Sequence, residues 1–536
     1  VPDSRPEGGE TVKAAIQVVF CKCCTEVPPL LNIERLVKQA TDTNMVVSVM
    51  AADAVCDGKD VRRVVADARD MEADRAVVFA CSKKDFNPAL LDAYRRAGMN
   101  EFLVDIVNLR EEAVLSHLAQ PEAAQAKAET MLRAAIEKIV ARSPLQKQTE
   151  EMKTKNVVII GAGVAGRAAA EEAAKAGVHT VLLEKSGRSY KAPGVILTNS
   201  QLVAASGYGG NFRLKIKAGE KLEELDAAAV IVATGGGWTT LKGSLAKAVK
   251  DAVPLYKFHE QMQSGAAPKG PVIFVDTPDP AGKTLIVRDF TWDETLETAL
   301  ELKKKHPATD IYVVFQEMRA MGLTELAYKE AAELGVRFVR YDRAGMPKVD
   351  QKNPGVVAVK DASQDQVLNI RFGTMVFSSN PLNEDNKAIA DALRIPMSAD
   401  GGIRRGSIQR GPVSTPSPGI YVCGSALFPK TREVAKEEGE AAGALAGEFV
   451  RKGRIEYGGV VAQVTQEKCS ACLTCVRTCP YEAPFIGTAS KAEIRVQACQ
   501  GCGMCVGICP SKAIELLNVT DDIIGSEARN LLGGDF

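Results

Sequence analysis

Short apolar runs alternate with amphipathic segments along the first part of the chain. Segments such as 33–41 and 60–71 repeat apolar residues with helical spacing. The apolar runs between them are rich in valine and have the length of buried strands. These strands are predicted at residues 16–21, 46–49, 75–80 and 102–107. Alternation of this kind predicts an α/β domain with a parallel sheet over residues 1–145.

A polar segment, 144–155, separates this region from a second α/β domain, expected over residues 154–455. Its first strand is predicted at 156–160. A strand–helix–strand unit is predicted further along, at 310–315, 323–334 and 336–341. After a second linker, a cysteine-rich module spans 461–520, and a short tail at 521–536 follows it. The overall prediction is an α/β protein with a small cysteine-rich domain at its C-terminal end.

Composition narrows the functional classes. Of the 536 residues, 67 are basic and 67 are acidic, so the net charge gives no support to nucleic-acid or polybasic membrane binding. No apolar stretch reaches the ~18 residues that a membrane-spanning helix needs. The first ten residues are polar and carry no signal-peptide core, so we expect a cytoplasmic protein. Fourteen cysteines in a reducing compartment then favour metal or redox chemistry over disulfides.

Eight of the cysteines form two runs with the spacing of bacterial ferredoxins, each ending in Cys-Pro. In such runs three close thiolates bind one [4Fe–4S] cluster and the fourth binds the other cluster. The first cluster is therefore assigned to Cys469, Cys472, Cys475 and Cys509. The second is assigned to Cys499, Cys502, Cys505 and Cys479. Zinc knuckles or disulfides are the alternative, and two intact runs with a trailing proline argue against them.

A glycine-rich turn after the strand at 156–160 predicts a dinucleotide site. Backbone amides at the start of the following helix would hold a pyrophosphate. The residues of this turn are Gly161, Gly163, Ala165 and Gly166. A second strand, 179–183, ends at Glu184, where a ribose hydroxyl partner is expected, with Lys185 next to it.

Two later segments bear on which dinucleotide is bound. Residues 229–235, ending in Thr234-Gly235, and residues 419–424, followed by Ser425, resemble strands of flavoproteins with two dinucleotide-binding domains. By this resemblance Gly424 would meet the isoalloxazine, and the site would bind FAD. Each segment alone could equally be a buried strand ending in a glycine turn. The strand at 272–275 is followed by Asp276-Thr-Pro-Asp-Pro, and no second glycine motif for NAD(P)H is evident.

With these segments together, nearly the whole chain resembles the iron–sulfur flavoprotein family formed by the A-type subunit of heterodisulfide reductase and its relatives. Matching blocks include Cys21-Lys-Cys23, Ala80-Cys81-Ser82, Asn108-Leu-Arg110-Glu111, Phe315-Gln-Glu-Met-Arg319 and Pro429-Lys430. The resemblance implies a thioredoxin-reductase-like FAD domain. It also implies a third [4Fe–4S] cluster on Cys21, Cys23, Cys56 and Cys81. The alternative for these four is that they are small buried hydrophobic residues. Cys24 and Cys423 are interpreted as structural.

The chain also departs from this family. The family carries an inserted ferredoxin domain, whereas residues 214–225 run on without cysteine here. The family's cysteine cluster before the Met-Arg block is missing from residues 276–310, and Lys185-Ser-Gly-Arg188 replaces its Gly-Gly-Arg. The sequence therefore indicates a reduced member, in which flavin-based electron bifurcation by the chain alone is not expected.

The function indicated is an oxidoreductase subunit that transfers electrons between FAD, the clusters and partner subunits of a larger complex. A dimeric core, with a paralogous flavin subunit as one partner, is expected by resemblance. Lys430 is either a residue that tunes the flavin or a solvated surface lysine. Two alternatives remain: a stand-alone NAD(P)H- or ferredoxin-linked reductase, and a scaffold that wires clusters without an active flavin.

Overall fold

The computed structural model describes residues 14–532, apart from 23–26, 28, 82, 189, 237–248, 250–251, 264, 277–284, 343–346, 351–352, 378–384, 400 and 407–410. The chain divides into two compact units. One unit combines Val1–Thr149 with Glu456–Phe536, and the other is Glu150–Ile455. The short strands β5 (Lys147–Glu151) and β22 (Arg454–Gly458), in which the chain passes from one unit to the other, form a two-stranded sheet.

The first unit begins with a four-stranded parallel sheet of order β2-β1-β3-β4. Helices α1 and α4 pack in the hydrophobic core on one face of this sheet, and α2 and α3 pack in the core on the other. The strands are β1 (Ile16–Cys21), β2 (Val46–Ala52), β3 (Arg75–Ala80) and β4 (Val104–Asn108). The helices are α1 (Ile33–Thr41), α2 (Gly58–Asp70), α3 (Lys83–Arg96) and α4 (Pro121–Ala141). The predicted parallel α/β arrangement is confirmed.

One predicted strand begins later than expected. Residues 101–103 form a 3-10 turn instead of the start of the strand predicted at 102–107. The side chain of Asn100 accepts a hydrogen bond from the Phe102 N–H at 3.0 Å, which holds the turn. The apolar run 102–107 is therefore divided between this turn and β4.

The C-terminal part of the same unit has two short hairpin-like sheets around a small core. Strand β23 pairs with β26, and β24 pairs with β25, both antiparallel. Cysteines, alanines and short aliphatic residues make up the core between them. The elements are β23 (Ala462–Val464), α12 (Thr474–Thr478), β24 (Pro484–Ile486), β25 (Ala492–Ile494), α13 (Met504–Gly507) and β26 (Ile514–Leu516).

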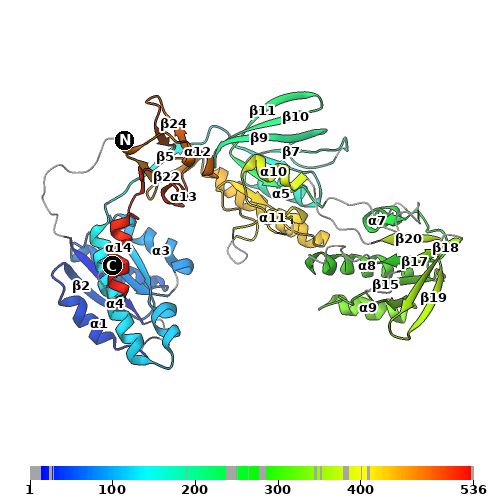
Figure 1. Cartoon of the computed structure of the whole chain (residues 1–536), viewed down its shortest axis with the longest axis horizontal. Coiled ribbons are helices and arrows are strands. Elements are labelled where there is room, and N and C mark those ends of the chain that lie inside the picture. Colours follow the sequence, from blue (N-terminus) through cyan, green and yellow to red (C-terminus); the bar gives the residue numbers. More distant parts are fainter. Residues whose placement is uncertain are drawn as a thin grey trace. The chain divides into compact units, whose positions relative to one another are not determined.

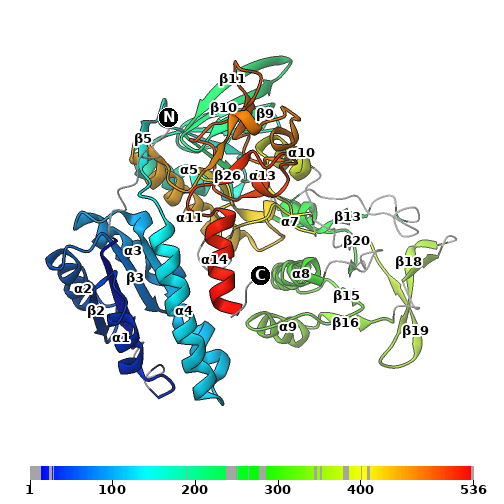
Figure 2. The same ribbon diagram turned by 60° about the vertical axis from the view of Figure 1, so that its left-hand side comes forward.

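The segment interpreted from sequence as a short tail contains a helix, α14 (Asp521–Leu532). It lies along α4 in both views (Figures 1 and 2). Lys138 and Glu527 form an ion pair at 2.8 Å, and the Glu137 carboxylate accepts hydrogen bonds from Ser526 at 2.8 Å and Asn530 at 2.6 Å. These contacts join the cysteine-rich module to the N-terminal domain in one unit.

The second unit contains two parallel sheets, each with five strands. The first has the order β21-β12-β6-β7-β8, and the second has the order β13-β20-β14-β15-β16. The first comprises β6 (Asn156–Ile160), β7 (His179–Leu183), β8 (Val195–Leu197), β12 (Ala229–Val232) and β21 (Ile420–Val422). The second comprises β13 (Val253–Pro254), β14 (Val272–Val275), β15 (Ile311–Phe315), β16 (Arg337–Arg340) and β20 (Thr374–Phe377).

Two antiparallel three-stranded sheets complete this unit. One is β9 (Ser200–Tyr208), β10 (Asn211–Ala218) and β11 (Lys221–Ala227), and the other is β17 (Lys348–Asp350), β18 (Asn353–Asp361) and β19 (Gln366–Arg371). The helices are α5 (Val164–Lys175), α7 (Leu255–Gln263), α8 (Leu285–Lys305), α9 (Thr324–Glu333), α10 (Asp385–Leu393) and α11 (Arg432–Arg451). The cysteine-free stretch 214–225 thus belongs to the β10–β11 hairpin, which turns at Gly219.

None of the helices in the described part of the chain is long and apolar enough to cross a bilayer.

Candidate cofactor sites

The two cysteine runs have the same backbone conformation although their sequences differ. In the second run Gly501 and Gly503 have φ angles of 60° and 72°. The equivalent residues of the first run, Ala471 and Leu473, have φ angles of 54° and 63°. Side chains normally disfavour this left-handed region. The first run thus adopts the same loop shape without glycine.

The pKa shifts of two thiols and their causes indicate which cysteines are near neighbours. Burial, followed by the neighbouring Cys499, Cys479 and Cys502, raises the pKa of Cys505 to about 11. Cys479 belongs to the first run in the sequence, but its thiol is a neighbour of Cys505 in the second run. Burial raises the pKa of Cys475 as well, and its cysteine neighbours are Cys472 and Cys469. The assignment of Cys479 to the second cluster remains a prediction.

Backbone amides point at several of these sulfurs. The N–H groups of Ala462, Ala492 and Ala513 donate to Cys499, Cys469 and Cys509 at 3.5, 3.5 and 3.3 Å. Such bonds stabilise thiolate ligands and tune cluster potentials. In the part of the chain described, no three His, Cys, Asp or Glu side chains converge as the ligands of one metal ion do.

The N-terminal cysteines lie at one edge of the first sheet. Cys21 is buried at the end of β1, Cys56 is exposed between β2 and α2, and Cys81 follows β3. Burial is the main cause that raises the pKa of Cys81, followed by the nearby charges of Glu111, Cys21 and Cys56. The structure therefore brings three of the four predicted ligands together. Cys23 and Cys24 lie outside the described residues.

Glu111 is a carboxylate at this edge that could join the site. It lies in a π-helical turn, Arg110–Val114, directly after β4. Its Oε1 accepts a hydrogen bond from Arg110 at 3.0 Å, and its Oε2 is buried without a hydrogen-bond partner among the described residues. Single π turns occur frequently at functional sites. A cubane bound to these cysteines would thus have a carboxylate beside it.

The glycines of the turn between β6 and α5 differ in the space around them. A Cβ at Gly161 would lie 2.3 Å from the carbonyl oxygen of Ala233, and one at Gly166 would lie 1.9 Å from that of Gly161. A Cβ at Gly163, the N-cap of α5, would meet no heavy atom within 4 Å. The first two glycines allow close packing, whereas Gly163 leaves open space at the helix N-terminus. This arrangement fits a bound pyrophosphate.

The strand order places this turn at the crevice where dinucleotides bind. From β6 the chain moves to β7 on one side, while β12 and β21 lie on the other, so β6 and β12 flank the switch point. Thr234 and Gly235 follow β12, and Thr234 donates a hydrogen bond to Asn386 at 2.8 Å. Ala165 is buried in the first turn of α5, against Gly424. The predicted residues therefore meet at one edge of the sheet.

Glu184 and Lys185 have protein partners in this structure. The Glu184 carboxylate accepts hydrogen bonds from the Ala162 N–H at 3.1 Å and from the Ser186 hydroxyl at 2.7 Å. Lys185 pairs with Asp385 at 2.7 Å and its side chain is 59% exposed. Ser186 belongs to the segment Lys185-Ser-Gly-Arg188 that follows β7 and Glu184. Its hydroxyl fixes the orientation of the carboxylate next to the glycine turn.

Lys430 is buried, with 3% of its side chain exposed, so the alternative of a solvated surface lysine is wrong. Its ammonium group forms an ion pair with Glu438 and lies 3.9 Å from the centre of the Phe428 ring. The backbone N–H of Gly424 donates to the same carboxylate oxygen at 2.9 Å. Sequence reasoning missed Glu438.

A stripe of glycines brings α11 against α5. Cβ atoms at Gly439 and Gly443 would lie 2.2 and 2.3 Å from the carbonyl oxygens of Ala165 and Ala169, so only glycine allows this approach. The repeat of glycine every four residues, continued by Gly447, was visible in the sequence. It fixes the start of α11, and with it Glu438, relative to the glycine turn.

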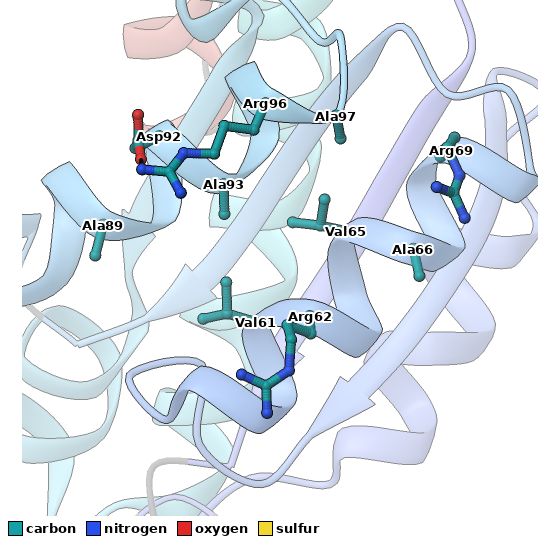
Figure 3. A pocket seen from close by; sticks show the side chains of 10 residues that line it. All are labelled: Val61, Arg62, Val65, Ala66, Arg69, Ala89, Asp92, Ala93, Arg96 and Ala97. Carbon is teal, nitrogen blue, oxygen red and sulfur yellow. Dashed lines mark ion pairs between the residues drawn. The ribbon is translucent and has the colours of Figure 1, made fainter.

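A shallow groove of about 360 Å³ lies elsewhere, between α2 and α3 (Figure 3). Valine and alanine side chains line it together with Arg62, Arg69 and Arg96, and Arg96 pairs with Asp92 at 2.6 Å. None of the predicted cofactor residues lines this groove, and we assign it no ligand.

Comparison with known proteins identifies one family directly. The 4Fe-4S dicluster domain family matches residues 462–510. An A-type iron-sulfur subunit of the CoB–CoM heterodisulfide reductase of Methanopyrus kandleri is 23% identical over 87% of this chain and 90% of its own. A protein of Archaeoglobus profundus that is named for its likeness to the same type of subunit is also 23% identical, with the same coverage of 87% and 90%. The alignment with the first relative spans 602 positions, more than the 536 residues of this chain. The relative therefore contains residues that have no counterpart in this chain.

Solved structures match a little over half of the chain. Thioredoxin reductase of T. acidophilum is 15% identical, with 56% of this chain and 98% of that one covered, at a TM-score of 0.40. An NAD-dependent persulfide reductase of A. fulgidus is 17% identical, with 58% and 62% covered, at a TM-score of 0.37. The fold assignment rests on the strand orders given above and on the dicluster family.

Proposed function

We propose that this chain is a member of the family of the A-type heterodisulfide reductase subunits and their relatives, and that it is the electron-transfer subunit of a multi-subunit oxidoreductase. The similarity of 23% identity over 87% of the chain supports the first part of this proposal. It would carry electrons between FAD and [4Fe–4S] clusters and pass them to a partner protein. The observation that supports this most directly is the presence, in one chain, of a dicluster domain and of a glycine turn open for a pyrophosphate. Clusters of this type transfer electrons without binding a substrate.

We assign FAD to the edge of the first sheet in the second unit. The pyrophosphate would be held by the glycine turn, formed by Gly161, Gly163, Ala165 and Gly166. The adenine side would be held by Glu184 and Lys185. Thr234 and Gly235 would line the site from the end of the neighbouring strand. Gly424, Ser425 and Lys430 would lie on the isoalloxazine side. When bound, FAD supplies a group that exchanges electrons with the clusters. The chain contributes positioning: Glu438 holds Lys430 and the Gly424 loop in place.

We assign the clusters as the cysteine spacing predicts. Two belong to the C-terminal module, one on Cys469, Cys472, Cys475 and Cys509 and the other on Cys499, Cys502, Cys505 and Cys479. A third would bind Cys21, Cys56 and Cys81, with Cys23 as the fourth ligand. The N–H groups that point at the sulfurs of the C-terminal module support the first two assignments.

The test is the cofactor content of the full-length protein, prepared anaerobically with its partners removed. We expect one FAD and about twelve iron atoms per chain, four for each cubane. Full iron without flavin, even after reconstitution, would favour the cluster-wiring scaffold. Rapid flavin reduction by NADPH would favour the stand-alone reductase. Zinc in place of iron would contradict the cluster assignment.

Partner subunits are part of this proposal, because the relatives are named as subunits of heterodisulfide reductases. A paralogous flavin subunit could complete a dimeric core. The β10–β11 hairpin and the stretch 276–310 contain no cysteine, and in this proposal the chain would offer a single electron path. We therefore expect the isolated, reduced protein to reduce one acceptor class only. Simultaneous reduction of a low-potential and a high-potential acceptor, without any partner, would contradict this expectation.

A further inference from the structure

One carboxylate holds both ends of the loop that follows β21. Glu438, in the second turn of α11, accepts the Gly424 N–H at 2.9 Å and the ammonium group of Lys430 on the same oxygen. Gly424 begins the loop and Lys430 ends it before α11. Since both groups donate to Glu438, the loop conformation and the position of the Lys430 charge depend on this one side chain.

The ion pair is removed from water. The Lys430 side chain is 3% exposed and that of Glu438 is 14% exposed. Lys430 also lies over the Phe428 ring, and the guanidinium of Arg405 lies 5.4 Å from the centre of that ring. Removal of one member of a buried pair leaves the other charge uncompensated. Each partner therefore controls the net charge of this loop.

The helix that carries Glu438 is fixed against the glycine turn. Gly439, the next residue, packs so closely on α5 that a Cβ would lie 2.2 Å from the Ala165 carbonyl oxygen. Gly424 itself faces Ala165: a Cβ added at Gly424 would lie 2.9 Å from the Cβ of Ala165. The loop, Glu438 and the start of α5 thus form one packed corner at the predicted pyrophosphate site.

We propose that Glu438 is a positioning residue that sets the charge next to the flavin. It places the Lys430 ammonium and cancels its charge. This inference rests on the proposed FAD site. A positive charge near a flavin favours the reduced form, which carries more negative charge, and a negative charge disfavours it. Loss of Glu438 and loss of Lys430 should therefore shift flavin reduction in opposite directions.

The experiment compares Glu438→Gln, Lys430→Gln and the double variant in the full-length, FAD-loaded protein. The ratio of reduced to oxidised flavin is measured by its visible spectrum, in equilibrium with a dye of known potential at pH 7. We expect at least a tenfold increase in this ratio for Glu438→Gln, about 30 mV for a two-electron couple. We expect a decrease of similar size for Lys430→Gln, and a value near wild type for the double variant.

The exposed pair Lys436 and Glu440 on the same helix, 3.6 Å apart, provides the matched control. Its neutral variants, Lys436→Gln and Glu440→Gln, should leave the ratio unchanged. Equal ratios in all variants, or shifts of the same sign in both single variants, would overturn the inference.

If Lys430→Gln does not fold, the ratio of reduced to oxidised flavin must still be higher in Glu438→Gln than in the double variant. A wild-type protein that takes up no FAD would overturn the proposed function and this inference with it. That outcome is read from the wild type alone.

Discussion

Replacement of Gly163 by valine should separate cofactor binding from folding. Gly163 is the N-cap of α5 with φ −68° and ψ −168°, a conformation open to any residue, and an added Cβ would meet no protein atom within 4 Å. The cost to the fold is the loss of a favourable N-cap residue, about 1 kcal/mol. In a unit of this size that lowers the melting temperature by about 2 °C. The valine would, however, occupy the space assigned to the pyrophosphate.

Gly166 provides the contrasting case three residues later. A Cβ there would lie 1.9 Å from the Gly161 carbonyl oxygen, which belongs to the backbone of the turn and cannot move aside cheaply. Overpacking of this kind costs about 3 kcal/mol. Gly166→Val should therefore lose both stability and flavin, whereas Gly163→Val should lose flavin alone.

The assay is FAD content after gel filtration, read together with the thermal melt of the same sample. Gly355→Val serves as the control, because Gly355 lies in β18 on a different sheet and its nearest contact for a Cβ, the Phe372 carbonyl oxygen, is at 3.6 Å. The control should keep both flavin and melting temperature. Wild-type FAD content in Gly163→Val would refute the assignment of the pyrophosphate to this turn.

Three further predictions concern the first unit. Cys56→Ser with Cys81→Ser should lower the iron content by about four atoms per chain, and an unchanged count by iron assay would show that these cysteines are packing residues. Leu473→Gly should keep all the iron and raise stability by up to about 1 kcal/mol, because it removes a side chain from φ 63°; a lower melting temperature of the module would contradict this. Truncation after Val519 removes α14 and its ion pair with Lys138, so the first unit should become sensitive to protease while the second stays resistant. Equal protease sensitivity with and without α14 would show that the helix contributes no stability.

Most of the local structure could be predicted from apolar patterning. Strands β1, β3 and β6 coincide with the predicted runs, and α9 lies within the predicted helix at 323–334. The docking of α14 on α4 could not be predicted, because it depends on partners about 390 residues away, such as Ser526 and Glu137. Amphipathic spacing indicates that a helix has a buried face, but not which element covers it.

The site was predictable where the chemistry fixes the spacing. The cysteine runs and the glycine turn have fixed intervals, so their residues could be named in advance. Glu438 has no such signature, since it lies among Glu433, Glu437 and Glu440 on a helix where solvated glutamates are usual. Its role becomes visible only when α11 is placed against α5 and the Gly424 loop.

The two ferredoxin runs show how far local preference is overridden. Left-handed backbone costs a residue with a side chain about 1–2 kcal/mol, and the first run adopts it at both Ala471 and Leu473. Strained conformations persist only where the surroundings determine them fully. Here the surroundings include hydrogen bonds from backbone N–H groups to three cysteine sulfurs, and the proximity of Cys479 to the second run. Cluster binding and folding of the module should therefore be one linked event. Removal of iron would then be expected to disorder the module while the second unit, which holds none of the predicted ligands, stays folded.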